Sequence, residues 1–143
     1  LHLWPAQAAT RARARSVSAE MHSGFAALRS HFPFNVEANL PQVGQRVLAE
    51  QAAVRADVSR ITQLWSDCLG ASGGPFLFGG FGIADAFFAP IVLRFRTYEV
   101  ELPPSCRAYA DAVLALPAMR EWIAAAERET ESIAEFDQYE PAP

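Results

Sequence analysis

The chain has 143 residues and a formal net charge of −4, and hydrophobic residues make up 51% of it. This length and composition suffice for one domain with a buried core, and they exclude a largely disordered chain. The acidic balance argues against a protein that holds nucleic-acid phosphates on a basic surface, so we expect no nucleic-acid partner.

The sequence shows no sign of a membrane protein or of an oxidising compartment. No apolar run reaches the roughly 18 residues that a membrane span needs. Cys68 and Cys106 stand far apart without a disulfide framework, so we expect a cytoplasmic protein with no membrane partner. The chain starts at Leu1 without a signal-peptide pattern, and we interpret it as the C-terminal part of a longer polypeptide.

A first helix is predicted over residues 6–32 and ends before Pro33, because proline lacks a backbone N–H. Hydrophobic residues recur in it at steps of three and four, the pattern of one buried helix face. A polar, cationic stripe runs beside this face and is formed by Arg11, Arg15, Ser18, His22, Phe25 and Arg29.

A loop over 34–40 leads to a long helix predicted from 41 to 69, with Pro41 at its start and Gly70 after its end. Gln51 interrupts its apolar line. We interpret Gln51 as a hydrogen-bonded glutamine in the core, since buried polar groups normally have partners.

The Gly-rich stretch 76–82 is too short to predict a strand. The next helix, 83–98, is apolar almost all round, which favours a central position in the core. Pro90 lies inside it and predicts a kink. Asp85, at its third position, is expected to accept a backbone N–H at the helix start, a structural capping role.

Two shorter helices follow, the first with Ser105 as the expected N-cap and the second beginning at Pro117. The second is predicted to bury Met119, Trp122, Ile123 and Ala126. These five helical segments predict an all-α fold, a helical bundle of five or more helices around a central buried helix. We expect a single helical domain over 1–143, with 1–5 as a linker remnant and 131–143 as a tail.

The sequence contains no known catalytic or metal-binding motif, so we expect no catalytic residue and no metal in this chain. The cationic stripe suggests a cleft that receives a ligand with both charge and apolar surface. The candidate substrate-binding residues are Arg15, Ser18, His22 and Phe25. The alternative interpretation of His22 is a structural or solvated histidine on a helix flank.

Three segments resemble, in the right order, the C-terminal domain of cytosolic glutathione S-transferases. Segment 19–25 (AEMHSGF) is similar to part of the first helix of that domain in bacterial, beta-class-like members. Segment 78–86 (FGGFGIADA) is similar to the capping region that opens its central helix. Segment 114–122 (LALPAMREW) is similar to the Pro-initiated turn between its last two helices.

The resemblance implies that an N-terminal thioredoxin-like domain, absent from this chain, binds the co-substrate glutathione and carries the Tyr, Ser or Cys that stabilises its thiolate. It implies a homodimer that conjugates glutathione to small apolar electrophiles in detoxification. His22 matches a cleft-facing position, and Arg15 lies near a position that reaches glutathione in the neighbouring subunit. Asp85 matches the family's capping aspartate. Two positions depart from the family: Gly82 stands where Ser or Thr is usual, and Ser23 stands where Lys is common.

Two other functions remain open from the sequence. Helical domains of this family also serve as non-catalytic modules for protein assembly, which would use an exposed apolar patch. A glutathione-dependent isomerase would have the same helical half. In each of the enzymatic cases, the isolated 143 residues are predicted to be inactive.

Overall fold

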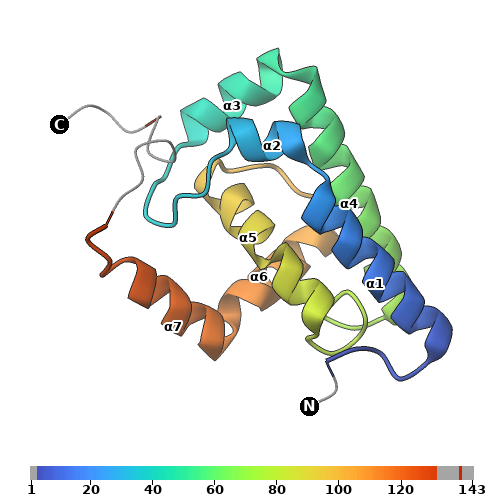
Figure 1. The fold of residues 1–143 in the computed structure, drawn as a ribbon. Coiled ribbons are helices and arrows are strands. Elements are labelled where there is room, and N and C mark those ends of the chain that lie inside the picture. Colours follow the sequence, from blue (N-terminus) through green and yellow to red (C-terminus); the bar gives the residue numbers. More distant parts are fainter. Residues whose placement is uncertain (1–2, 132–138, 140–143) are drawn as a thin grey trace.

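The computed structural model describes residues 3–131 and 139 (Figure 1). Within these residues it contains helices and no strand, only an isolated bridge between Phe76 and Gly79, which confirms the predicted all-α class. The helices are α1 (Ala8–Ser23), α2 (Ala26–His31), α3 (Pro41–Glu50), α4 (Ala52–Ser72), α5 (Ile83–Thr97), α6 (Pro104–Ala115) and α7 (Pro117–Ala126).

The single helix predicted over 6–32 is wrong, because the chain breaks into α1 and α2. The N–H of Gly24 donates to the carbonyl of Glu20 at 2.8 Å and ends α1. Phe25 then adopts a left-handed backbone with φ of 57° while its ring is buried in the core. On the far side of the turn, the N–H of Leu28 donates to Asp57 Oδ2 of α4 at 2.9 Å, which caps α2 from another helix.

The long helix predicted over 41–69 is also two helices, separated at Gln51. Gln51 has extended backbone angles and is half-buried, so it marks the joint between α3 and α4 and the core interpretation is wrong. Arg55 stabilises the break, since its Nη1 donates to the carbonyls of Leu48 and Ala49 at 2.6 and 3.0 Å. These are carbonyls that the end of α3 leaves without helical partners.

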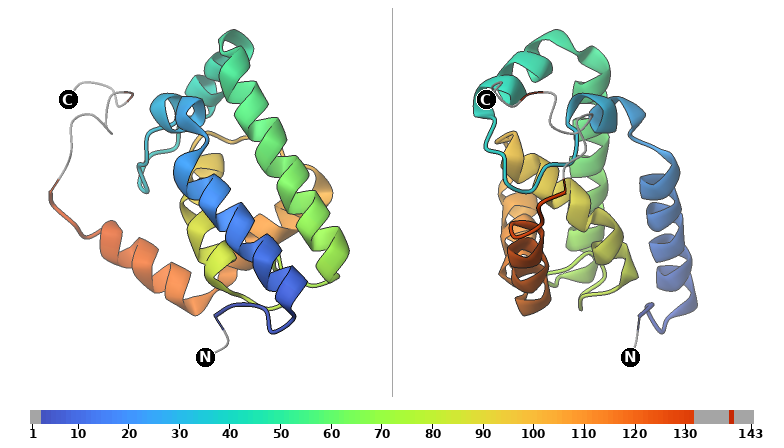
Figure 2. Two further views of the ribbon diagram at one scale, coloured as in Figure 1. Left: turned by 45° about the vertical axis from the view of Figure 1, so that its right-hand side comes forward. Right: turned by 60° about the vertical axis from the view of Figure 1, so that its left-hand side comes forward.

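The predicted central helix is confirmed as α5, which packs against α1 and α6. In the right-hand view of Figure 2, α5 lies between α1 on one side and α6 on the other. The fully buried Trp65 of α4 makes edge contacts with Phe88, Phe95 and Tyr109, which joins α4, α5 and α6 in one core. Asp85 is also fully buried; its Oδ2 accepts the N–H of Gly82 at 2.8 Å.

Two expectations for the last helices need correction. Ser105 is not the N-cap of α6, because the helix already includes Pro104 and its cap is Pro103. Trp122 is not buried on α7 but 44% exposed, with its ring stacked on Phe34 at 6.0 Å. Most of the tail predicted for 131–143 lies outside the described residues.

Candidate functional site

The C-terminal end of α5 holds the loop that follows α2. Four side chains from this end donate to four backbone carbonyls of the loop: Arg94 to Phe32, Tyr98 to Pro33, Thr97 to Asn35 and Arg96 to Val36. The donors are within 3.2 Å of their acceptors. This set of bonds, the α5 clamp, fixes Phe34 in place beside α5.

One line of α5 stays accessible although most of the helix is buried, and outside this line only Ala86 and Arg96 are exposed. Ile83, Phe87, Pro90 and Arg94 recur at steps of four, three and four, so they lie on the same side of the helix. None of the four is fully buried, and Phe87 is 40% exposed. We call this line the α5 stripe.

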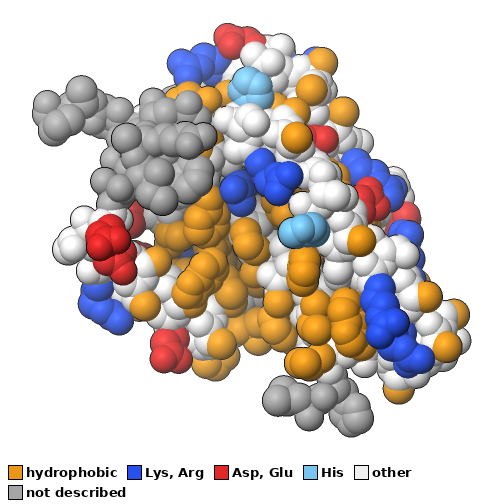
Figure 3. Space-filling model, viewed as in Figure 1, with side chains coloured by type: hydrophobic (Ala, Val, Ile, Leu, Met, Phe, Trp, Pro, Cys, Tyr) orange, Lys and Arg blue, Asp and Glu red, His pale blue; other side chains and the backbone are white. Residues whose placement is uncertain are grey.

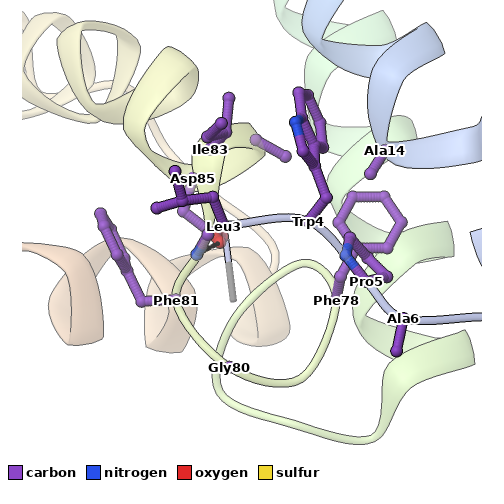
Figure 4. Close-up of a pocket in the computed structure, with 12 residues that line it drawn as sticks. Leu3, Trp4, Pro5, Ala6, Ala14, Phe78, Gly80, Phe81, Ile83 and Asp85 are labelled. Carbon is purple, nitrogen blue, oxygen red and sulfur yellow. Dashed lines mark hydrogen bonds between the residues drawn. The ribbon is translucent and has the colours of Figure 1, made fainter. Parts of the chain in front are cut away.

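At the start of the α5 stripe, the N-terminal segment covers Ile83. The N–H of Ile83 donates to the carbonyl of Leu3 at 3.1 Å. Figure 4 shows Leu3 and Trp4 lying over the start of α5, above the loop that carries Phe78 and Phe81. These residues line a pocket of about 230 Å³.

Two residues of α1 make aromatic contacts on this side of the molecule, Arg15 with Trp4 and His22 with Phe87. The Arg15 guanidinium lies over the Trp4 ring, 5.7 Å from its centre. The ring of His22, two turns later, makes an edge contact with Phe87, with centroids 6.4 Å apart. Arg15 and His22, seven positions apart, therefore lie on the same side of α1: His22 contacts the α5 stripe directly, and Arg15 contacts the N-terminal segment that lies at the start of the stripe.

At the end of the stripe, Arg94 contacts an aromatic pair. Its Nε donates to the Phe32 carbonyl at 2.8 Å, and its guanidinium lies over the Phe34 ring, 5.1 Å from the centre. Phe34 in turn stacks on Trp122. Burial lowers the pKa of Arg94 to about 10, and the positive charge of Arg29 adds to this effect.

The surface that these residues share is largely apolar. Figure 3 shows hydrophobic side chains gathered across this face between α1 and α7, with Arg and His side chains at their edge. Such an arrangement can bind an apolar molecule and orient it by a few charged groups.

The structure separates the four predicted site residues into two pairs. Arg15 and His22 are exposed beside the α5 stripe. Ser18 is buried and its hydroxyl donates to the Ala14 carbonyl at 2.9 Å, while the Phe25 ring is buried at the turn between α1 and α2. The substrate-binding role of all four residues stays a prediction.

Sequence reasoning missed the residues of the stripe and its aromatic neighbours. The nearly continuous apolar character of 83–98 predicts a central helix and gives no sign that Phe87 and Arg94 are accessible. The signal that could have found them is the spacing of Arg94 from Phe87, which puts the last-turn cation on the same side as a large apolar side chain.

The described residues were also searched for metal ligands, reactive thiols and membrane-spanning helices. No group of three or more metal-ligating side chains comes together in residues 3–131. Both cysteines are buried, and burial raises the pKa of the Cys68 thiol. None of the helices in these residues is long and apolar enough to span a membrane.

The chain was compared with the sequence models of known protein families and with curated proteins. The sequence model of the family described as "Glutathione S-transferase, C-terminal domain" matches residues 7–125. No curated protein matches the chain.

Proposed function

Since this chain belongs to the glutathione S-transferase C-terminal domain family, we propose that it is the electrophile-binding half of a bacterial, beta-class-like glutathione transferase. The observation that carries the proposal is the accessible α5 stripe, bordered by Arg15 and His22 of α1. Phe87 exposes a large apolar side chain on the central helix, and an apolar substrate needs such a surface.

The exposed apolar side chains support a second domain that packs against this chain. Leu3, Phe81, Phe87 and Trp122 are each at least 40% exposed. We assign the surface that covers these side chains to an N-terminal thioredoxin-like domain, which holds glutathione and the residue that stabilises its thiolate. The substrate cleft then lies between that domain and the α5 stripe.

In the reaction, the glutathione sulfur forms a bond to an electrophilic carbon, and the bond from that carbon to its leaving group breaks. The residues of this chain act by position: they hold the electrophile near the thiolate and exclude water. Arg15 and His22 orient the two molecules at the border of the cleft. The active protein is a cytoplasmic homodimer that serves in detoxification.

A second candidate function is a non-catalytic assembly module of the same fold. The exposed Trp122 and Phe87 favour it as well, because aromatic side chains are common at protein interfaces. A glutathione-dependent isomerase would share the proposed cleft, but it would release glutathione unchanged instead of leaving it bonded to the product.

The test compares the 143-residue chain with the two-domain parent in the conjugation of glutathione to 1-chloro-2,4-dinitrobenzene. We expect turnover by the parent and none above background by the chain alone. Turnover by the chain alone would contradict the division of roles. A folded parent without conjugation or isomerisation activity would favour the assembly module.

A further inference from the structure

A cavity between the start of α1 and the end of α4 has no role in the proposed reaction. It contains no residue of α5, and its third wall is Phe78 from the loop that follows α4. Its volume is about 330 Å³. This volume lies at the lower end of the range for small-molecule sites, roughly 300–1,000 Å³, and therefore favours a small ligand.

The two helical walls of this cavity carry opposite charges. Arg13 lines it from α1 and Asp67 lines it from α4, and both residues are exposed. They do not pair with each other, because the single ion pair among the described residues joins Arg60 to Glu20. Asp67 Oδ1 accepts a hydrogen bond from Gln63 Nε2 at 2.7 Å, which leaves Oδ2 for another donor. The cavity thus holds a cation and an anion apart, and each can pair with a ligand group of opposite sign.

The ends of the two helices strengthen this polarity. The first turn of α1 has a positive partial charge and contains no acidic residue, and its Thr10 lines the cavity. The last turn of α4 has a negative partial charge and contains no basic residue, and its Ser72 lines the cavity. One wall is therefore positive and the other negative, which fits a ligand that carries both charges.

Between the charged walls the lining is apolar. Ala9 of α1, Ala71 of α4 and Phe78 contribute hydrocarbon surface. The Cys68 thiol stays protonated, because burial raises its pKa more than the charge of Arg13 lowers it. A neutral thiol does not compete with a ligand carboxylate for Arg13. The lining therefore favours an apolar side chain, and the Phe78 ring favours an aromatic one.

We propose that this cavity binds an apolar α-amino acid, with its carboxylate at Arg13, its ammonium group at Asp67 and its side chain against Phe78. A guanidinium group suits the carboxylate because it can donate two parallel hydrogen bonds. The site lies apart from the α5 stripe, so this inference does not depend on the proposed transferase activity.

Titration calorimetry of the 143-residue chain with three probes that share one phenyl ring tests the proposal. L-Phenylalanine carries both charges, phenethylamine lacks the carboxylate, and 3-phenylpropanoate lacks the ammonium group. We expect phenylalanine to bind about tenfold more tightly than either of the others, because each missing charge removes a charge-assisted contact. Equal affinities for the three probes, or no binding of phenylalanine, would overturn the proposal.

Two variants at exposed positions assign the ligand charges to their residues. Arg13→Gln should reduce the preference for phenylalanine over phenethylamine to less than threefold and keep its preference over 3-phenylpropanoate. Asp67→Asn should have the reverse effect. Circular dichroism checks that both chains are folded. Undiminished preferences in the two folded variants would place the ligand elsewhere and overturn the proposal.

The matched controls are Arg46→Gln and Glu50→Gln, which make the same changes of charge at exposed positions of α3 outside the cavity. Both should keep the two preferences of the unaltered chain. Loss of a preference in either control would show an effect of net charge and overturn the assignment. Ala71→Leu fills the cavity itself and should lower the affinity for phenylalanine at least tenfold, and an unchanged affinity would also overturn the proposal.

A last titration distinguishes a free amino acid from glutathione, whose γ-glutamyl end carries the same ammonium and carboxylate groups. Glutathione should bind about tenfold more weakly than phenylalanine, because a polar amide chain replaces the ring against Phe78. Equal or tighter binding of glutathione would overturn the assignment to an apolar amino acid.

Discussion

The ring of Phe32, just after α2, stacks on the ring of Tyr98 at the end of α5, with centroids 4.3 Å apart and planes inclined by 10°. The Tyr98 hydroxyl also donates to the Pro33 carbonyl at 3.2 Å. Both rings are buried, and burial raises the pKa of Tyr98. This pair therefore joins the loop that carries Phe34 to the helix that carries Arg94.

Removal of the Tyr98 ring should destabilise the chain far more than removal of its hydroxyl. Tyr98→Ala leaves a cavity beside Phe32, and we expect a loss of about 3–5 kcal/mol in the free energy of unfolding. Tyr98→Phe loses one hydrogen bond and leaves the Pro33 carbonyl unpaired, about 1–2 kcal/mol. Urea unfolding followed by circular dichroism measures both. Equal losses would show that the stack contributes little.

Gly44 in α3 lies against the backbone of Tyr98, so a side chain has no room there. A Cβ on Gly44 would lie 1.9 Å from the Tyr98 carbonyl oxygen. We expect Gly44→Ala to cost about 1–3 kcal/mol, although alanine favours a helix. The control is Gly70→Ala in α4, where a Cβ meets nothing within 4 Å.

Gly70→Ala should stabilise the chain by about 0.5–1 kcal/mol, because alanine has less freedom to lose on folding than glycine. The midpoints of urea unfolding should therefore shift in opposite directions for the two variants. A stabilised Gly44→Ala chain would mean that α3 does not pack against the end of α5 as closely as described.

Helix α5 ends in a motif that usually contains glycine but here contains Glu99. The N–H of Val100 donates to the Phe95 carbonyl, the N–H of Glu99 donates to the Arg96 carbonyl, and Glu99 has a positive φ of 47°. Glycine adopts this conformation without strain. We expect Glu99→Gly to stabilise the chain by about 0.5–1 kcal/mol in thermal unfolding. Glu101→Gly, at an exposed position with ordinary φ, should not stabilise it.

The sequence predicted α5 almost to the residue, since a continuous apolar run follows Gly82 and includes the capping Asp85. The break at Phe25 escaped prediction because the apolar spacing continues through it: the ring is buried as a helix would bury it, while the backbone turns. A distant residue, Asp57, accepts the N–H of Leu28 and so stabilises the start of α2 after the break. Local periodicity holds no information about such a partner.

The candidate site was predictable only in part for a similar reason. The seven-residue spacing of Arg15 and His22 correctly put both on one side of α1. The other half of the site depends on the α5 clamp, which brings Phe34 from a loop to Arg94, 60 positions later in the chain. Such a pairing arises from tertiary packing and leaves no periodic signal.

Asp85 should make the stability of the chain depend on pH in an identifiable way. Burial raises its pKa above the ordinary 3.8, although the N–H groups of Leu77 and Gly82 oppose the shift. The folded chain therefore holds the Asp85 proton more tightly than the unfolded chain. This group's contribution to stability is complete below pH 3.8 and is lost as the pH rises through the folded pKa.

Asp85→Asn removes the ionisable carboxyl group and one of the two side-chain oxygens that accept backbone N–H groups. It should therefore lower the free energy of unfolding by about 1–3 kcal/mol near pH 4. We expect the stability difference between the unaltered chain and Asp85→Asn to narrow as the pH rises from 4 to 7. Urea unfolding at a series of pH values measures it. A difference that widens with pH would show that the hydrogen bonds outweigh burial and lower the pKa of Asp85.

His22 should contribute to turnover and not to folding. Its ring is exposed on α1 and contacts Phe87 at the edge of the proposed cleft. His22→Ala in the two-domain parent should lower kcat/KM for 1-chloro-2,4-dinitrobenzene several-fold. The thermal midpoint of the 143-residue chain should stay within error, because exposed substitutions rarely change stability by more than about 0.5 kcal/mol. His31→Ala, a histidine of α2, is the matched control and should leave kcat/KM unchanged. An unchanged kcat/KM in His22→Ala would identify His22 as a solvated residue outside the cleft.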